Sequence, residues 1–275
     1  MHLLELEPYD IYERLAIEDI QQALDIIRPV YDRTKGRDGF VSLEVSPLIA
    51  DDTQKTVSEA KRLFATVNRP NIMIKIPATD AGIPAIEEVI AEGINVNVTL
   101  IFSVKNYEQV MEAYIRGLEK RKSAGKPVTG IQSVASFFVS RIDAAVDRVL
   151  DNNIRAAQGR DLGRVALNNK LKGKAAIANA KLAYKRFRQI FHGARFESLR
   201  EAGGAVQRPL WASTGVKNPA YSDTMYVDAL IGPETVNTVP PDTLKAFKDH
   251  GTAAPTLMDG LDEAEQIMDM LAEVG

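Results

Sequence analysis

The sequence predicts a single α/β domain of the (β/α)-barrel class. Short β-rich runs alternate with helical segments along the chain, which is typical of parallel strands joined by right-handed crossovers. The 275 residues are enough for one such barrel without a second domain. Polar residues also recur toward the carboxyl ends of several strands, where barrels of this class carry their active sites.

The expected elements follow from apolar periodicity and from Gly and Pro at the borders of the segments. The chain begins with an amphipathic helix at 10–31, expected to end near Pro29. Further helices are expected at 53–68, 83–92 and 104–122. Six strands are expected, at 39–45, 71–76, 94–102, 131–139, 208–213 and 225–231.

A longer helical stretch at 141–206 separates the fourth and fifth of these strands, and it is predicted as a helical insertion on the rim of the barrel. Residues 1–275 are otherwise one barrel domain in this interpretation. The one basic concentration, at 170–188, is interpreted as a solvated helix face.

The composition narrows the class of partner. Lys and Arg number 34 against 37 Asp and Glu, for a net charge of −3, which argues against a surface for nucleic acid or anionic membrane. A small-molecule partner is therefore expected, and a homo-oligomer is left open. The first residues lack the basic and apolar regions of a secretory signal, and no apolar run approaches ~18 residues, so a cytoplasmic protein is expected.

The chemistry has to use groups other than thiols, because the chain has no cysteine. Its three histidines, His2, His192 and His250, lie outside the predicted strand ends, which disfavours a histidine metal site or a Ser-His-Asp triad. No glycine-rich nucleotide-binding pattern is present. We therefore expect neither a metal nor a cofactor.

Three predicted strands alternate polar and apolar residues, although strands covered by helices usually read as continuous Val, Ile and Leu. The segments are VSLEV at 41–45, IMIKI at 72–76 and INVNVT at 94–99. Successive side chains of a strand point to opposite faces. If the aliphatic faces pack on helices, one set of polar side chains converges inside the barrel: Glu44, Lys75, Asn97 and Thr99.

Lys75 is the candidate reactive group in this set. Burying a lysine is costly unless it is paired or loses its proton, and a lysine among apolar walls can attack a carbonyl and form a Schiff base. The alternative is an ion pair between Lys75 and Glu44 that only fixes packing. Asn97 and Thr99 favour the functional interpretation, since a purely structural interior has no use for so many hydrogen-bonding groups.

Two later segments indicate a phosphate-binding function. SFFVSR at 136–141 places Arg141 just past a strand, and WASTGVKN at 211–218 places Ser213, a glycine-containing turn and Lys217 past the next one. Charged donors beside a flexible backbone suit a phosphate monoester. For Arg141 alone, a surface salt bridge is the alternative.

Long runs of the chain resemble transaldolase, a (β/α)8-barrel enzyme of the pentose phosphate pathway. The matching runs are VSLEVSP at 41–47, IMIKIPAT at 72–79, GINVNVTLIFS at 93–103, SFFVSRID at 136–143 and RPLWASTGVKNPAYSDTMYVDALIGPETVNTVPP at 208–241. By this resemblance six of the eight barrel strands are visible here. The two N-terminal β/α units of the family, with a catalytic aspartate, and its final C-terminal helix are expected to be lacking, which predicts a truncated barrel.

The resemblance also implies roles for single residues. Lys75 matches the Schiff-base lysine, Glu44 and Thr99 match the pair that holds a catalytic water, and Asn97 matches the asparagine that hydrogen-bonds the dihydroxyacetone unit. Ser136 and Phe138 match active-site walls, while Arg141, Ser213 and Lys217 correspond to the region that grips the sugar phosphate.

The implied reaction transfers dihydroxyacetone from sedoheptulose 7-phosphate or fructose 6-phosphate to an aldose phosphate, either glyceraldehyde 3-phosphate or erythrose 4-phosphate. One alternative is a lyase similar to fructose 6-phosphate aldolase, which releases free dihydroxyacetone. The other is an inactive fragment of a longer transaldolase or of a fusion protein.

Overall fold

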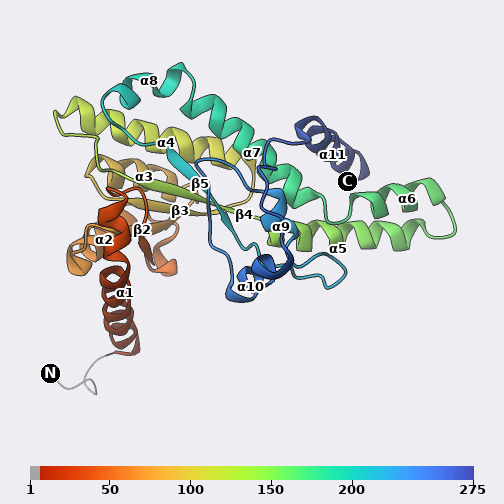
Figure 1. The fold of residues 1–275 in the computed structure, drawn as a ribbon, viewed down its shortest axis with the longest axis horizontal. Helices are drawn as coiled ribbons and strands as arrows, with labels where there is room; N and C mark the ends of the chain where they lie inside the picture. Colours follow the sequence, from red (N-terminus) through yellow and green to blue (C-terminus); the bar gives the residue numbers. More distant parts are fainter. Residues whose placement is uncertain (1–6) are drawn as a thin grey trace. The chain divides into compact units, whose positions relative to one another are not determined.

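The computed structural model describes residues 7–275, so the expectations about the first five residues and about His2 lie outside the described part. Helices and strands alternate along the first half of the chain (Figure 1). In order these elements are α1 (Pro8–Arg33), β1 (Val41–Glu44), the 3-10 helix η2 (Pro47–Ile49), α2 (Thr53–Val67), β2 (Ile72–Pro77), α3 (Gly82–Ala91), β3 (Val96–Ile101), α4 (Val104–Ser123) and β4 (Ser133–Phe138).

Helices dominate the second half. Its elements are α5 (Ser140–Ala157), α6 (Leu162–Leu171), α7 (Ala175–Phe191), α8 (Ala194–Glu201), β5 (Gln207–Ala212), α9 (Met225–Ala229), β6 (Val236–Asn237), α10 (Pro241–His250) and α11 (Leu261–Val274). The predicted helical stretch 141–206 thus forms α5 to α8.

The strands form one six-stranded sheet in the order β1-β2-β3-β4-β5-β6. The ladders of β1 with β2, β2 with β3, and β5 with β6 are parallel. The predicted α/β class and the number of strands are therefore confirmed. None of the helices among residues 7–275 is both long and apolar enough to cross a membrane.

The chain is divided into two compact units. Unit 1 contains the described residues up to Thr99, together with Gln109–Val134 and Ala194–Gln207. Unit 2 contains Leu100–Glu108, Ala135–Gly193 and Arg208–Gly275.

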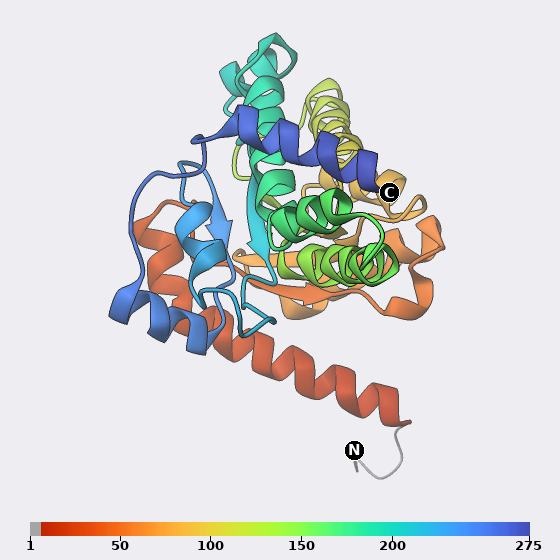
Figure 2. The same ribbon diagram turned by 90° about the vertical axis from the view of Figure 1, so that its right-hand side faces the viewer.

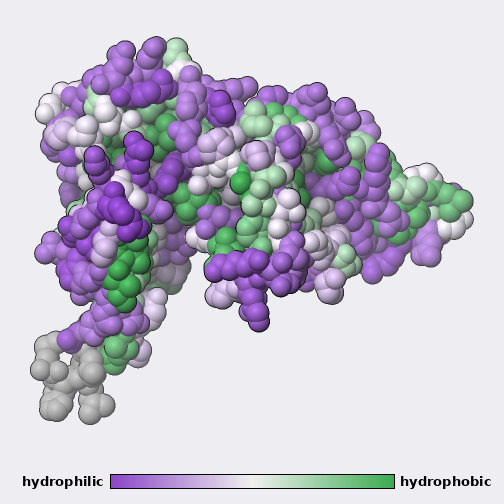
Figure 3. Space-filling view, viewed as in Figure 1, coloured by the Kyte–Doolittle hydropathy of each residue, from purple (hydrophilic) through white to green (hydrophobic). Residues whose placement is uncertain are grey.

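The core of unit 1 is centred on β2. Ile72, Ile74 and Ile76 are fully buried, and both α2 and α3 contact this strand. This arrangement agrees with the prediction that the aliphatic face packs on helices. Helix α1 contacts β1 and α2, whereas its N-terminal end extends away from the strands of its unit, and apolar side chains are visible on its surface (Figures 1 and 3). Its exposed apolar side chains include Tyr12, Leu15 and Ile26.

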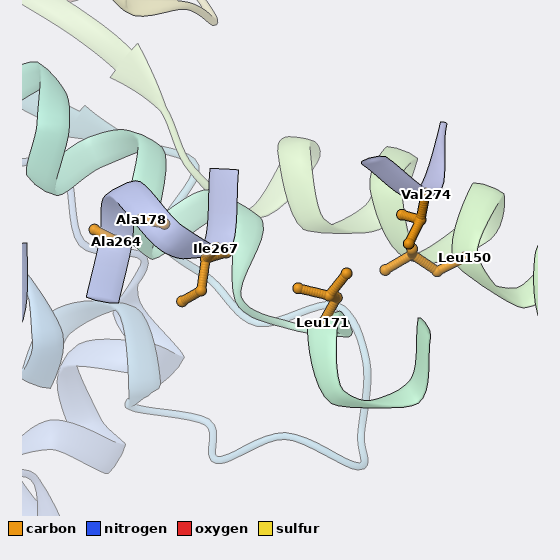
Figure 4. Close-up of a cluster of buried hydrophobic side chains, with 6 residues drawn as sticks. All are labelled: Leu150, Leu171, Ala178, Ala264, Ile267 and Val274. Atoms are coloured by element: carbon orange, nitrogen blue, oxygen red, sulfur yellow. The ribbon is translucent and has the colours of Figure 1, made fainter. Parts of the chain in front are cut away.

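In unit 2, helix α11 packs across α7 (Figure 2). These two helices are part of a small apolar cluster that also includes residues of α5 and α6 (Figure 4). The buried members of the cluster are Leu150, Leu171, Ala178, Ala264, Ile267 and Val274.

The prediction of a strand at 225–231 was wrong, because residues Met225–Ala229 form helix α9 and the sixth strand is β6 at Val236–Asn237. A short apolar run bounded by turns has the same signature in a buried strand and in a buried helix. Here Thr224 starts the helix: its carbonyl accepts a bond from the Asp228 N–H at 3.0 Å, and its hydroxyl donates to the Asp228 carboxylate at 2.6 Å.

The first helix is also longer than predicted, because α1 continues through Pro29 to Arg33. Proline lacks the N–H that would bond the carbonyl of Asp25, which usually ends or kinks a helix. Both Asp25 and Pro29 are exposed, so water can satisfy that carbonyl. The other predicted strands agree with the structure to within two residues at each end.

Candidate active site

The strand register of unit 1 places three predicted site residues in one row. Glu44 of β1 is the Cα partner of Lys75 of β2, and Lys75 is in turn the partner of Asn97 of β3. Partners in adjacent parallel strands present their side chains on the same face of a sheet. The polar row predicted from alternation therefore exists in the fold.

Lys75 is paired with a carboxylate. Its Nζ donates to Oε2 of Glu44 at 3.2 Å. The Lys75 side chain is 29% exposed and that of Glu44 is 46% exposed, so neither group is deeply buried. An inward lysine is tolerated when it is paired with an opposite charge or when it loses its proton. The structure shows the pairing, with Glu44. A solvent-accessible amine beside a carboxylate is open to a carbonyl substrate and has a group in reach to accept its proton.

Asn97 lies at the other end of the row and is 6% exposed. Its Nδ2 donates to Oγ of Ser42 on β1 at 3.0 Å. Ser42 is polar on the same face as Glu44, and the alternation of β1 was the signal that could have identified it as a site residue.

Thr99 is the most buried of the set, at 1% exposure. Its backbone carbonyl accepts a bond from the Ala78 N–H at 2.8 Å, which fixes the end of β3 against β2. Its Oγ1 is buried and has no hydrogen-bond partner among residues 7–275. An unsatisfied buried hydroxyl is costly in a purely structural position.

The turn that follows β2 is held tightly. Oγ1 of Thr79 donates to the carbonyl of Ala50 at 2.7 Å and accepts a bond from the Gly82 N–H at 2.9 Å. A Cβ on Gly82 would lie 2.0 Å from the carbonyl oxygen of Pro77, so only glycine fits where α3 begins. Lys75 thus sits on a strand whose carboxyl end is anchored.

The remaining predicted residues, Ser136, Phe138, Arg141, Ser213 and Lys217, all belong to unit 2. Ser136 and Phe138 are buried, at 3% and 8% exposure. The guanidinium of Arg141 lies over the ring of Phe138, 4.9 Å from its centroid, and that ring packs against Phe102 at 5.1 Å. A cation over an aromatic face is attracted by the ring, which restrains the Arg141 side chain.

Ser213 follows the last residue of β5 and has a left-handed conformation, with a φ of 58°. A non-glycine residue with positive φ is uncommon and indicates a constrained position. Its Oγ lies 2.9 Å from Oγ of Ser140, the first residue of α5, and its carbonyl accepts the Ser140 N–H at 2.9 Å. Lys217 is exposed and lines a cavity of about 280 Å³ with Ser140 and Tyr221.

Sequence reasoning missed two aspartates that anchor this part of unit 2. Asp143 accepts bonds from the hydroxyl of Tyr226 at 2.8 Å and from the Ala176 N–H at 2.8 Å, and burial raises the pKa of its carboxyl. Asp147 accepts a bond from the hydroxyl of Tyr221 at 2.6 Å. Both lie at one-turn spacing on α5 after Ser140, a pattern that could have indicated a polar helix face turned inward.

In unit 1 the structure aligns Glu44, Lys75 and Asn97 in one row, with Thr99 two residues further along β3. In unit 2 it places Arg141 over Phe138 and Ser213 against Ser140. Among residues 7–275, no group of three or more His, Asp or Glu side chains could hold a metal ion. The roles of all nine residues stay predictions.

Helices that alternate with parallel strands, and a lysine on the polar face of the sheet, are consistent with an enzyme built on a TIM-barrel type of fold. The family model described as transaldolase/fructose-6-phosphate aldolase matches residues 2–275. The chain therefore belongs to the transaldolase/fructose-6-phosphate aldolase family, and the resemblance noted in the sequence is confirmed.

Several curated relatives are named transaldolase. Transaldolase 2 of Nostoc sp. is 52% identical over 271 residues, which cover 98% of this chain and 70% of the relative. Transaldolase 1 of Streptomyces avermitilis is 57% identical over 233 residues, covering 85% and 59%. The transaldolase of Trichodesmium erythraeum is 48% identical over 264 residues, covering 96% and 69%. The alignments thus span between 59% and 70% of these relatives.

Proposed function

We propose that the protein is a transaldolase that transfers a dihydroxyacetone unit through a Schiff base on Lys75. The donor is sedoheptulose 7-phosphate or fructose 6-phosphate, and the acceptor is glyceraldehyde 3-phosphate or erythrose 4-phosphate. The observation that supports the proposal most is the row of Glu44, Lys75 and Asn97 on one face of the sheet. Its relatives named transaldolase, about half identical, support the choice of reaction.

The first step needs a neutral amine. Lys75 loses a proton, for which Glu44 at 3.2 Å is the acceptor in reach, and attacks the ketone carbon of the donor. Loss of water then leaves an iminium between Nζ and that carbon. A covalent intermediate of this kind divides one difficult step into easier ones.

The second step breaks the carbon–carbon bond. Its electron pair moves toward the iminium nitrogen, which gives a three-carbon enamine on Lys75, and the hydroxyl proton of the departing fragment has to be accepted as the aldose phosphate forms. We assign that proton to a water held by Glu44 and Thr99. The buried, unpartnered hydroxyl of Thr99 supports the assignment, since a bound water would satisfy it.

The third step reverses the second with a new acceptor. The enamine carbon attacks the aldehyde of the acceptor, and hydrolysis of the resulting iminium releases the new ketose phosphate and the free amine. In this proposal Arg141, Ser213 and Lys217 bind the phosphate, while Ser136 and Phe138 form walls. The setting is the pentose phosphate pathway in the cytoplasm, and the partners are sugar phosphates rather than nucleic acid or membrane.

Two alternative functions each predict a distinct experimental result. Release of free dihydroxyacetone without an acceptor would identify a lyase similar to fructose 6-phosphate aldolase, an activity that the family description includes. Absence of turnover would identify an inactive fragment, which is relevant because the chain spans only part of the length of its relatives.

The test is to incubate the chain with fructose 6-phosphate, reduce with borohydride and locate the adduct by peptide mass spectrometry. We expect a three-carbon adduct on Lys75 and none in Lys75→Arg, because arginine keeps the charge but cannot form the imine. A six-carbon adduct would show imine formation without cleavage. No adduct on Lys75, when a longer relative treated in parallel gives one, would refute the proposed activity for this chain.

A further inference from the structure

The hydrogen bond between Asn97 and Ser42 spans three strands. Asn97 is on β3 and Ser42 is on β1, so the bond passes over β2, which lies between them. Outer strands of such a triplet are about 10 Å apart, because neighbouring strands are separated by ~4.8 Å. Both side chains must therefore lean toward each other over the middle strand.

The register shows what the bond passes over. The Cα partner of Ser42 on β2 is Met73, whereas the partner of Asn97 is Lys75. The bond therefore crosses diagonally between the Met73 and Lys75 positions. Met73 is 2% exposed and carries no hydrogen-bond donor. The hydrogen bond thus joins the Asn97 side chain, next to Lys75 in the register, to a strand that lies on the other side of β2.

This hydrogen bond fixes the side-chain amide of Asn97. An asparagine amide presents a donor end and an acceptor end, and rotation about its last bond exchanges them. With Nδ2 donating to Ser42 at 3.0 Å, a flip would turn Oδ1 toward Ser42 and reverse every other interaction of the amide. Because a hydroxyl can donate as well as accept, Ser42 restrains the Asn97 side chain beside Lys75 in either orientation of the amide.

We propose that Ser42 is a positioning residue that, through Asn97, controls whether the three-carbon intermediate is transferred or released. The inference rests on the proposed function. The intermediate has to wait on Lys75 while one aldose phosphate leaves and another enters, and Asn97 is the neighbour of Lys75 in the polar row. A fixed amide holds the intermediate in the geometry that the acceptor needs.

Release is the competing reaction. The enamine carbon takes up a proton, water adds to the iminium carbon, and the carbon–nitrogen bond breaks to give dihydroxyacetone and the free amine of Lys75. A rotating amide would hold the intermediate less well and admit water more often. Loss of the Ser42 hydroxyl should therefore favour release over transfer.

The experiment measures the ratio of free dihydroxyacetone to transferred product with fructose 6-phosphate as donor and an aldose phosphate as acceptor. We expect Ser42→Ala to raise this ratio by about fivefold to tenfold, the size expected when one net side-chain hydrogen bond is lost. The KM of the donor should change little, because Ser42 is not one of the residues assigned to the phosphate. Ser42→Thr keeps the hydroxyl and should restore the ratio.

Ser133→Ala is the matched control. Ser133 is a buried strand serine of unit 1, whose Oγ donates to the carbonyl of Val96 at 2.7 Å and accepts a bond from Gln207 at 2.9 Å. Its loss should reduce the urea midpoint without changing the ratio. If Ser42→Ala behaves in the same way, or if Ser42→Thr does not restore the ratio, the positioning role is wrong.

Failure of the proposed function would look different. If the unaltered chain gives no adduct on Lys75, the proposed transaldolase function and the proposed role of Ser42 are both wrong. If it gives the adduct but Ser42→Ala leaves the ratio of free dihydroxyacetone to transferred product unchanged, only the proposed role of Ser42 is wrong. The side-chain amide signal of Asn97 in nitrogen-15 NMR spectra provides a structural readout, since it should shift in Ser42→Ala and not in Ser133→Ala.

Discussion

The pair between Lys75 and Glu44 contributes little to folding. Half-exposed ion pairs stabilise proteins by about 0 to 1 kcal/mol, because water screens them and two long side chains must be ordered. The side chains here are 29% and 46% exposed. The free energy of unfolding should therefore depend little on this pair, so a role of Lys75 and Glu44 in chemistry can be tested apart from their role in packing.

We therefore expect Glu44→Gln to separate activity from stability. The amide keeps the size of the side chain but cannot accept a proton, so the transfer rate should fall by about 10²- to 10⁴-fold, the usual contribution of a positioned acid–base group. The free energy of unfolding should change by less than about 1 kcal/mol. Steady-state rates and urea unfolding check the two parts. A large loss of stability with an unchanged rate would favour the packing interpretation.

Asp143 is a buried carboxyl, unlike the partly exposed Glu44, and its environment disfavours the charged form. Burial raises the pKa of this carboxyl, so the folded chain holds the proton more tightly than the unfolded chain. Its contribution to stability is complete below the ordinary pKa of aspartate and is lost as the pH rises through the raised value.

Asp143→Asn should flatten the pH dependence of stability over that interval, because asparagine does not titrate. Urea unfolding of both proteins, from the ordinary aspartate range upward in pH, tests this expectation. Asp147→Asn is the comparison variant on the same helix. Parallel curves for Asp143→Asn and the unaltered chain would show that Asp143 does not titrate in this interval.

At the scale of elements, α1 and α9 show where local signals mislead. Pro29 reads as the end of a helix, yet α1 passes through it because the affected carbonyl lies at an exposed position. The run at 225–231 reads as a strand, yet Thr224 starts a helix through local hydrogen bonds with Asp228. In both cases the residue types fit either of two local structures. Exposure to solvent allows α1 to continue past Pro29, and hydrogen bonds between Thr224 and Asp228 favour a helix at 225–229.

Pro29→Ala is predicted to stabilise the protein by about 1 to 2 kcal/mol, because it restores a backbone donor for Asp25 and outweighs the entropy gained by the unfolded chain. Pro8→Ala is the control, since Pro8 lies in the first turn of α1, where no N–H bond is lost. Urea unfolding gives both values. Equal effects of the two substitutions would show that the missing bond at Pro29 has no cost.

At the scale of the molecule, the boundary between the two units falls inside strands. β3, β4 and β5 each contain residues of both units. Unfolding one unit would therefore shorten strands that the other contains, and such coupling favours a single cooperative transition.

Trp211 allows a test of that cooperativity. It is the only tryptophan, it belongs to unit 2, and it is 1% exposed. We expect the urea transition followed by its fluorescence to coincide with the transition followed by far-UV circular dichroism, which reports both units. Two separated midpoints would show that the units unfold independently.

The sequence by itself determined the α/β class, five of the six strands and their approximate bounds, the family and the polar row around Lys75. These features follow from local period, since alternation fixes which side chains share a face and parallel neighbours align those faces. The runs at 41–47, 72–79 and 208–241 indicated the family, because a long matching run is far more specific than a short motif.

Only the tertiary structure decided the features that depend on partners distant in sequence. Local pattern does not show that Asn97 reaches Ser42 across β2, or that Asp143 accepts a hydrogen bond from the Tyr226 hydroxyl. Each depends on residues brought together by packing, whose free energy exceeds the small preferences of the local chain. The period of a strand fixes the direction of a side chain, and the fold fixes what that side chain meets.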